Sequence, residues 1–194
     1  MRFDQGPLGH YWFLTFEHAT ALHTASMACQ RELDMHRFAP VPHGGLHLTL
    51  DRIARVGGST DRQRARIAAA AEHACAQQKP FVLTVERLVN IRAAIGFLVT
   101  PEQQVRELRD ALRTATTSVI PDAPVKNSAT TPHVTIAYPL YEGLTADAVA
   151  AVNAPRPNLG QVTATVADVA MVALERRGGG YQWETTARIP LTGA

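Results

Sequence analysis

The sequence predicts an α+β fold in which two pseudo-symmetric lobes, each an antiparallel sheet with flanking helices, surround a central cleft. Two observations lead to this prediction. The order strand, helix, loop, strand, helix, strand occurs in both halves of the 194 residues, and a His-x-Thr strand stands at a matched place in each half. A duplicated unit with a pseudo-two-fold relation brings two such strands to one shared cleft.

The first half begins with an aromatic run at residues 11–16, which favours a β-strand. The next segment, residues 17–33, places apolar side chains at helical spacing: Leu22, Ala25, Cys29 and Leu33. Residues 39–45 are rich in Pro and Gly and predict a loop that leads into the first His-Thr strand. Ser59 and Thr60 are candidate N-caps of a helix that continues to Gln78, and residues 81–85 predict a further strand.

The second half repeats this order. Residues 95–99 predict a strand, and Thr100, Pro101 and Gln103 predict a helix with Thr100 as its N-cap. The apolar stripe of this helix is Val105, Leu108, Leu112 and Ala115. The remaining predicted elements are a loop over residues 121–132, the second His-Thr strand, a short helix over 145–152, strand-rich residues 162–174, a turn over 176–180 and a closing strand over 181–191.

We therefore expect residues 1–194 to form a single two-lobed domain, with pseudo-repeats at about 11–93 and 94–191 that share one core. The aromatic-aliphatic pair Phe13-Leu14 corresponds to Phe97-Leu98, an offset of 84 (97 − 13). This offset is close to the 86 positions (133 − 47) that separate the two histidines of the strand motifs.

The candidate site consists of His47-Leu48-Thr49-Leu50 and His133-Val134-Thr135-Ile136. Side chains alternate along a strand, so each copy presents an imidazole and a hydroxyl on one face and two apolar side chains on the other. One such triplet is expected by chance in a chain of this composition, and His18-Ala19-Thr20 also fits the pattern. That third copy lies in helix-favouring sequence without a β-branched run, so we treat it as coincidence.

Composition excludes several classes of protein. A net charge of +2 is too small for a nucleic-acid binder that depends on many phosphate contacts. Cys29 and Cys75 lack the spacing of a disulfide framework or a zinc site, which favours a reducing compartment. Residues 1–9 do not resemble a signal peptide, and no apolar run has the length of a membrane span. We expect a cytoplasmic monomer with no cofactor and no membrane partner.

Other residues have simpler structural interpretations beside the functional ones. His43 and His47 have the spacing of a helical metal pair, but Gly44 and Gly45 argue against a helix, so we predict no metal site. Tyr138 follows the second motif and is the predicted substrate-binding residue, by stacking on a base. We expect Trp12 and Trp183 to be core residues. The arginine run could track a phosphate backbone, but we expect it to be a solvated helix face: Arg52, Arg55, Arg62, Arg64 and Arg66.

The paired motif resembles that of the two-histidine phosphoesterase superfamily, which includes the 2′-5′ RNA ligase-like proteins and cyclic phosphodiesterases. The resemblance covers nearly the whole chain and implies two α+β lobes around a cleft. It also implies substrates with 2′,3′-cyclic phosphates or 2′-5′ linkages. Two positions depart from the family pattern. Asp51 and Arg52 stand where many relatives have a large apolar residue and glycine, and Tyr138 stands where relatives often have Arg.

We expect His47 and His133 to be the general acid and base of a metal-independent phosphoesterase that acts on RNA ends or a small cyclic nucleotide phosphate. Thr49 and Thr135 are the expected hydrogen-bond donors to the non-bridging oxygens. The sequence does not say which histidine is the acid. Two alternatives stay open: a non-catalytic RNA- or nucleotide-binding module with the same cleft, and a metal-dependent hydrolase.

Overall fold

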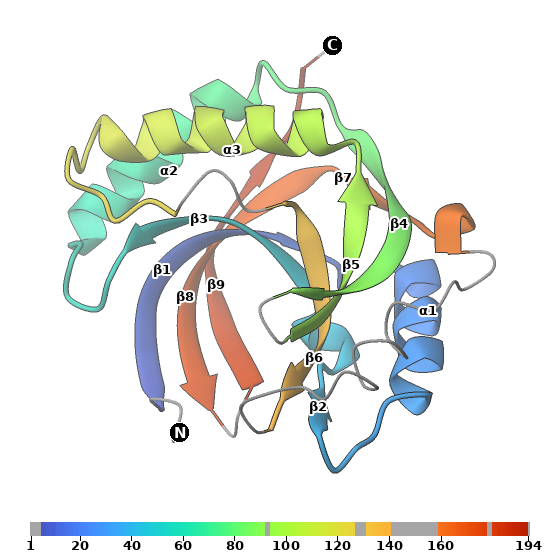
Figure 1. Cartoon of the computed structure of the whole chain (residues 1–194). Helices are drawn as coiled ribbons and strands as arrows, with labels where there is room; N and C mark the ends of the chain where they lie inside the picture. The colour runs from blue at the N-terminus through green and yellow to red at the C-terminus, as the bar shows by residue number, and fades with distance from the viewer. Residues whose placement is uncertain (1–4, 92–93, 127–130, 141–158, 178–179, 194) are drawn as a thin grey trace.

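The computed structural model describes residues 5–91, 94–126, 131–140, 159–177 and 180–193. In chain order, the elements of these residues are β1 (Gly6–Thr15), α1 (Thr20–Arg31), β2 (Phe38–Pro40), η1 (His43–Gly45), β3 (His47–Ala54), α2 (Asp61–Cys75), β4 (Phe81–Ile91), β5 (Ala94–Thr100), α3 (Glu102–Thr117), β6 (His133–Pro139), η2 (Leu159–Gln161), β7 (Thr163–Val166), β8 (Asp168–Arg177) and β9 (Gly180–Pro190). Figure 1 shows their arrangement. The helix predicted over residues 145–152 lies outside the described residues.

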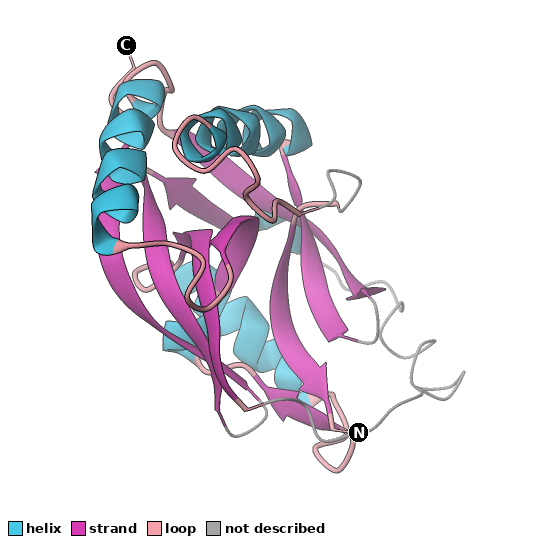
Figure 2. Cartoon of the chain, turned by 90° about the vertical axis from the view of Figure 1, so that its left-hand side faces the viewer, coloured by secondary structure: helices cyan, strands magenta, loops and turns pink. Residues whose placement is uncertain are grey.

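The strands form two antiparallel sheets, which confirms the predicted α+β class. One sheet has the order β3-β1-β8-β9 and the other the order β2-β6-β5-β4-β7. The sheets do not follow the two halves of the chain, because β4 joins the strands of the second half while β8 and β9 return to β1. Helices α2 and α3 pack together across one end of the strands, as Figures 1 and 2 show. The repeats at about 11–93 and 94–191 stay a prediction.

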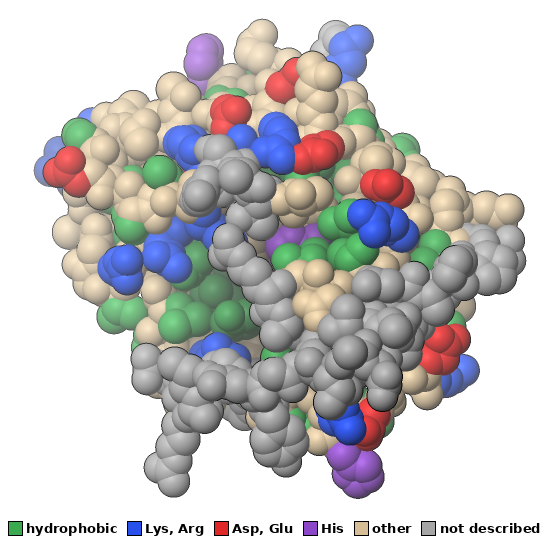
Figure 3. All heavy atoms as spheres, viewed as in Figure 1, with side chains coloured by type: hydrophobic (Ala, Val, Ile, Leu, Met, Phe, Trp, Pro, Cys, Tyr) green, Lys and Arg blue, Asp and Glu red, His purple; other side chains and the backbone are tan. Residues whose placement is uncertain are grey.

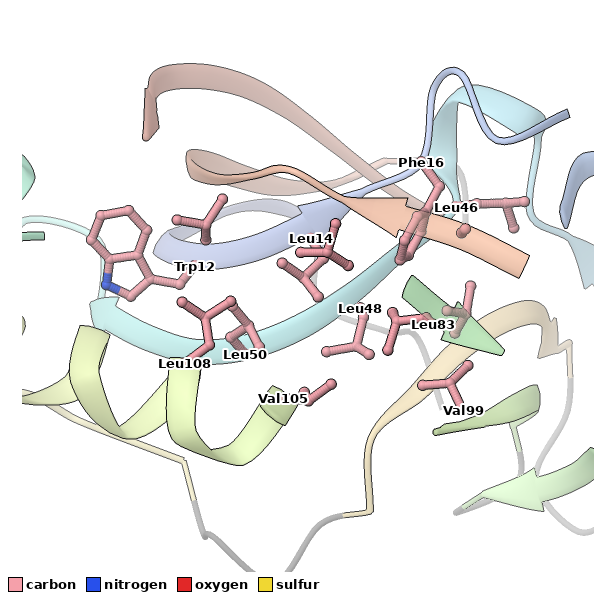
Figure 4. Close-up of a cluster of buried hydrophobic side chains, with 14 of the residues drawn as sticks. Trp12, Leu14, Phe16, Leu46, Leu48, Leu50, Leu83, Val99, Val105 and Leu108 are labelled. Atoms are coloured by element: carbon pink, nitrogen blue, oxygen red, sulfur yellow. The ribbon is translucent and has the colours of Figure 1, made fainter. Parts of the chain in front are cut away.

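One continuous core joins both sheets and the helices. Trp12 and Leu14 of β1 and Leu48 and Leu50 of β3 extend toward the side of α3 that carries Val105 and Leu108, as Figure 4 shows. The predicted α3 stripe is confirmed, because its four apolar residues are all buried. Trp12 is fully buried, and its indole Nε1–H donates to the Thr116 hydroxyl at 3.0 Å. Burial of large side chains such as these is the main source of fold stability.

Local signals predicted one helix start correctly and the other wrongly. Thr60 caps α2 in a full capping box, since its hydroxyl accepts from the Gln63 backbone N–H and Gln63 reaches back to the Thr60 N–H. Thr100 does not cap α3. It is the last residue of β5, and the cap position is held by Pro101, whose side chain has no acceptor. The loop predicted over residues 39–45 contains the end of the short strand β2, which pairs with β6.

The two His-Thr strands pair with their neighbours in the same register. Thr15 lies opposite His47 and Leu98 lies opposite His133, so equivalent residues of β1 and β5 are 83 positions apart (98 − 15). The offset of 84 predicted from the Phe-Leu pairs is therefore one residue too long. The error matters because a shift of one residue changes the face on which a side chain lies. Phe13 is equivalent to Gly96 rather than to Phe97.

Candidate active site

The two His-Thr motifs line a single cavity of about 340 Å³. His47 and Thr49 come from β3 in one sheet, and His133 and Thr135 come from β6 in the other. The alternate residues point the opposite way and are buried in the core: Leu48, Leu50, Val134 and Ile136. The structure thus brings the four sequence-predicted catalytic residues together from strands that are far apart in the chain.

Both imidazole rings are oriented by the same local hydrogen bond. The Nδ1 atom of each ring lies 2.8 Å from the carbonyl oxygen two residues earlier, which belongs to Gly45 for His47 and to Thr131 for His133. A carbonyl only accepts, so Nδ1 carries the hydrogen in both rings. Nε2 is then the ring nitrogen that can take up a proton, and a fixed tautomer of this kind suits an acid–base residue.

The surroundings of the two rings differ. His47 is only 6% exposed, and its ring stacks on Phe13 with centroids 4.2 Å apart and meets the edge of Trp183 at 4.9 Å. Burial, together with the smaller effect of the positive charges of Lys126 and His133, lowers the pKa of His47 to about 4, against the Gly45 hydrogen bond that raises it. His133 is half-buried. Its strand pairs with β5, in which Gly96 takes the position equivalent to Phe13. One histidine of the pair is therefore held neutral at pH 7.

A β-bulge after each motif turns a further side chain into the cavity. Thr49 and Asp51 lie opposite two consecutive residues of β1. In the same way, Thr135 and Ala137 lie opposite two consecutive residues of β5. Each motif strand therefore carries one extra residue, which reverses the alternation. The residue five positions after each histidine consequently lies on the cavity side. These residues are Arg52 and Tyr138, and both line the cavity.

Tyr138, predicted to bind substrate, lies in the wall of the cavity with its ring at the edge of Tyr181, centroids 5.2 Å apart. Burial and the neighbouring Tyr181 raise the pKa of Tyr138, against a hydrogen bond with the Thr135 hydroxyl that lowers it. The Tyr138 hydroxyl therefore stays protonated at neutral pH and can donate a hydrogen bond. Its role in substrate binding remains a proposal.

Sequence reasoning missed the positive groups of the site. Among the described lining residues are Arg52, Lys126 and Arg176, and none of the described lining residues is Asp or Glu. The prediction that Arg52 belongs to a solvated arginine run is wrong, because its Nε donates to the Tyr11 hydroxyl at 2.8 Å inside the site. The equal five-residue spacing from the two histidines is the signal that could have found it. Figure 3 shows Lys and Arg side chains gathered around a hollow with histidine and hydrophobic surface.

The aromatic predictions divide in a similar way. Trp12 is a core residue as predicted, whereas Trp183 is only partly buried and packs against the imidazole of His47. Over the described residues, no helix has both the length and the apolar character that a membrane span requires. No group of three or more His, Cys, Asp or Glu side chains suited to a metal ion occurs in that part of the chain.

Comparison with solved structures shows the fold. Escherichia coli LigT complexed with 3′-AMP superposes with a TM-score of 0.73 at 18% identity, covering 96% of this chain and 99% of LigT. TT0787 of Thermus thermophilus gives 0.71 at 18% identity, covering 95% and 98%. Usb1 of Kluyveromyces marxianus gives 0.56 at 13% identity, covering 94% and 97%. A sequence search of curated proteins found no match.

The sequence also matches the family model described as the 2'-5' RNA ligase superfamily, over residues 18–178. These residues include both His-Thr strands and the bulges that follow them. The match covers most of the chain and agrees with the fold of the solved relatives. The chain therefore belongs to the 2′-5′ RNA ligase superfamily.

Proposed function

We propose that this protein is a metal-independent phosphoesterase that opens 2′,3′-cyclic phosphates or acts on 2′-5′ linkages of RNA ends or small nucleotides. The observation that carries the proposal is the convergence of His47, Thr49, His133 and Thr135 on one cavity. Two imidazoles with Nδ1 fixed by backbone carbonyls provide a proton acceptor and a proton donor for an in-line displacement.

The asymmetry of the two rings supports an assignment of roles. The neutral state of His47 at pH 7, which follows from its lowered pKa, suits the base. His47 Nε2 takes a proton from water as the water oxygen forms a bond to phosphorus. His133 protonates the sugar oxygen as the bond from phosphorus to that oxygen breaks. The product is a phosphomonoester, and exchange with solvent resets both rings.

The hydroxyls and cations of the cavity support the stabilisation of negative charge. Thr49 and Thr135 lie on the same face as the histidines and can donate hydrogen bonds to the non-bridging oxygens. The positive side chains in the described lining suit a substrate with more than one phosphate, as at an RNA end. Solved relatives bind related molecules: E. coli LigT has been crystallised with 3′-AMP, with phosphate, with ATP and with NADP+.

A panel of substrates tests this proposal. Purified protein is incubated in EDTA with 2′,3′-cyclic nucleotides, 2′-5′ dinucleotides and an RNA ending in a 2′,3′-cyclic phosphate, and the products are identified by chromatography and mass spectrometry. We expect a 2′-phosphate from the cyclic substrates. Binding of these molecules without turnover would instead favour a non-catalytic RNA- or nucleotide-binding module. Loss of activity in EDTA would contradict metal independence.

The pH dependence tests the assignment of His47 as base. Because the pKa of His47 is lowered to about 4, kcat/KM should hold as the pH falls from 7 to 5 and should decline only below that range. An acidic limb near the ordinary histidine value of about 6.5 would contradict the assignment of the base to His47.

A further inference from the structure

Lys126 lines the cavity together with both catalytic histidines, although it lies in the connection between α3 and β6 rather than in either motif. Its positive charge reaches the site, since it contributes to the lowered pKa of His47. The chain has only two lysines, and the other, Lys79, is exposed. A cation that lines the same cavity as two imidazoles and two hydroxyls suits a phosphate oxygen.

The backbone of Lys126 is fixed on both sides by two buried or half-buried charged residues. Its N–H donates to Asp51 Oδ1 at 2.6 Å, and its carbonyl oxygen accepts from Arg113 Nη2 at 2.8 Å. Arg113 Nε in turn donates to Asp51 Oδ2 at 2.7 Å. These three residues form a closed hydrogen-bonded ring, which we call the charged clamp. The Asp51 side chain at its centre is 1% exposed.

The other half of the molecule has an uncharged version of the same arrangement. Gln30 of α1 donates through Nε2 to the carbonyl oxygens of Val41 and Ile136, both at 2.8 Å. The Val41 N–H donates to the same Ile136 oxygen at 2.8 Å. Gln30 and Arg113 are separated by the 83 positions (113 − 30) that relate β1 to β5. We call this the neutral clamp.

Each clamp therefore ties the connection after one helix to the motif strand in the other half of the chain. In the neutral clamp the residue held in this way is Val41, whose side chain is buried. In the charged clamp it is Lys126, whose side chain lines the cavity. Only the charged clamp needs a buried carboxylate. This carboxylate belongs to Asp51, whose position in its strand is equivalent to that of the buried Ala137.

We propose that Lys126 is a phosphate-binding catalytic residue of this site and that Asp51 and Arg113 are the positioning residues that hold it there. This inference rests on the proposed function. Lys126 would contact a non-bridging oxygen and stabilise the charge that builds up during the displacement, in addition to the hydroxyls of Thr49 and Thr135. The two positioning residues act through the Lys126 backbone and do not touch the substrate.

The first test compares three lysine variants. Lys126→Gln should lower kcat/KM for a 2′,3′-cyclic nucleotide by about 10²-fold, since it removes one charge-stabilising donor. Lys126→Arg keeps the charge and should restore most of the loss, while Lys79→Gln should match the wild type. Inorganic phosphate binding, measured by isothermal titration calorimetry, should weaken in Lys126→Gln only. Wild-type turnover and phosphate binding in Lys126→Gln would overturn the proposal.

The second test examines the positioning residues. Asp51→Asn and Arg113→Lys should each lower kcat more than they change the KM, and the loss should largely disappear when Lys126 is already Gln. An equal loss in both backgrounds would show that the clamp has only a structural role. If Asp51→Asn fails to fold, Arg113→Lys still removes the hydrogen bond to the Lys126 carbonyl while it leaves a charge beside Asp51.

A third measurement needs no activity. The pKa of His47 is followed by NMR in the wild type and in Lys126→Gln, and it should rise in the variant because a nearby cation is lost. The other titratable or charged groups of the described lining stay in place: Tyr11, Arg52, His133, Tyr138, Arg176 and Tyr181. An unchanged pKa would remove Lys126 from the site. If the wild type turns over no phosphodiester, the proposed function fails, but phosphate binding and this titration still decide the place of Lys126.

Discussion

The two His-Thr strands share a backbone design but differ in the side chains around it. Both have the same register with their neighbour, the same bulge after the Thr and the same ring orientation by a carbonyl. Around His47 the structure places the Phe13 ring and the edge of Trp183, whereas the residue equivalent to Phe13 beside His133 is Gly96. The shared backbone design therefore accounts for the matched positions of the two imidazoles, and the different neighbours account for the lowered pKa of His47.

The largest expected effect is loss of activity when either imidazole is removed. His47→Ala and His133→Ala should each lower kcat/KM by about 10²- to 10⁴-fold, and the double variant should lose little more, because the two act in one step. His18→Ala is the matched control, since it removes the histidine of the third His-x-Thr triplet, whose Thr20 is the first residue of α1. Near-wild-type activity in either cavity variant would break the proposed pairing.

The pH dependence of stability separates the two histidines next. The pKa of His47 in the folded state is about 4, below its unfolded value of 6.5, so the fold favours the neutral ring. The contribution of His47 to the free energy of unfolding is complete above pH 6.5. It is lost as the pH falls from 6.5 to 4, and the total loss is about 3 kcal/mol.

Urea unfolding between pH 7 and 4 measures this loss. His47→Gln should remove the corresponding part of the acid-dependent decline in the free energy of unfolding, whereas His133→Gln should retain it, since His47 is still present. The same slope in the wild type and in His47→Gln would show that the ring is not held neutral by the fold.

The glycine that replaces Phe13 in the second half has a steric reason, and this gives a smaller effect. A Cβ on Gly96 would lie 2.8 Å from the Val134 carbonyl oxygen in the neighbouring motif strand. Gly96→Ala should therefore lower the free energy of unfolding by about 1–3 kcal/mol. Gly160→Ala, where nothing lies within 4 Å of the added Cβ, is the control and should change it by less than about 0.5 kcal/mol.

The smallest effect concerns the residue that follows each bulge. Tyr138→Phe keeps the ring beside Tyr181 and should change KM for a cyclic nucleotide by less than about 3-fold, if the ring acts by stacking on the base. Tyr138→Ala should raise KM by about 5- to 100-fold. A larger loss in Tyr138→Phe than in Tyr138→Ala would assign the role to the hydroxyl rather than to the ring.

The sequence was sufficient to predict the fold class and the four residues that converge on the cavity. Alternation along a strand is a local rule, so it correctly placed His47 and Thr49 on one face and the neighbouring leucines in the core. The alternation rule fails at a bulge, and the bulges are set by strand pairing that the sequence pattern does not reveal. The rule therefore assigns Asp51 to the cavity face and Arg52 to the buried face, whereas Asp51 is buried and Arg52 lies in the cavity.

Other features depend on contacts between distant segments. Lys126 reaches the cavity because Asp51 and Arg113 hold its backbone, and these residues are separated by 75 and 13 positions from it. The sheet membership of β4, β8 and β9 is likewise not predictable from order alone, because consecutive strands of one half pair with the other. Thr100 satisfies the local rule for a cap, but pairing of β5 with β4 retains it in the strand.

The place of β9 in the sheet has a consequence for how the protein matures. This strand lies at the edge of its sheet, and it carries Tyr181 and Trp183, whose rings meet the imidazole of His47. A ribosome makes His47 134 residues before Tyr181 (181 − 47), at a rate of about 5–20 residues per second. During that interval His47 of the emerging chain is exposed to water and has the ordinary pKa of a histidine. The burial that lowers the pKa of His47 is thus complete only after β9 has docked.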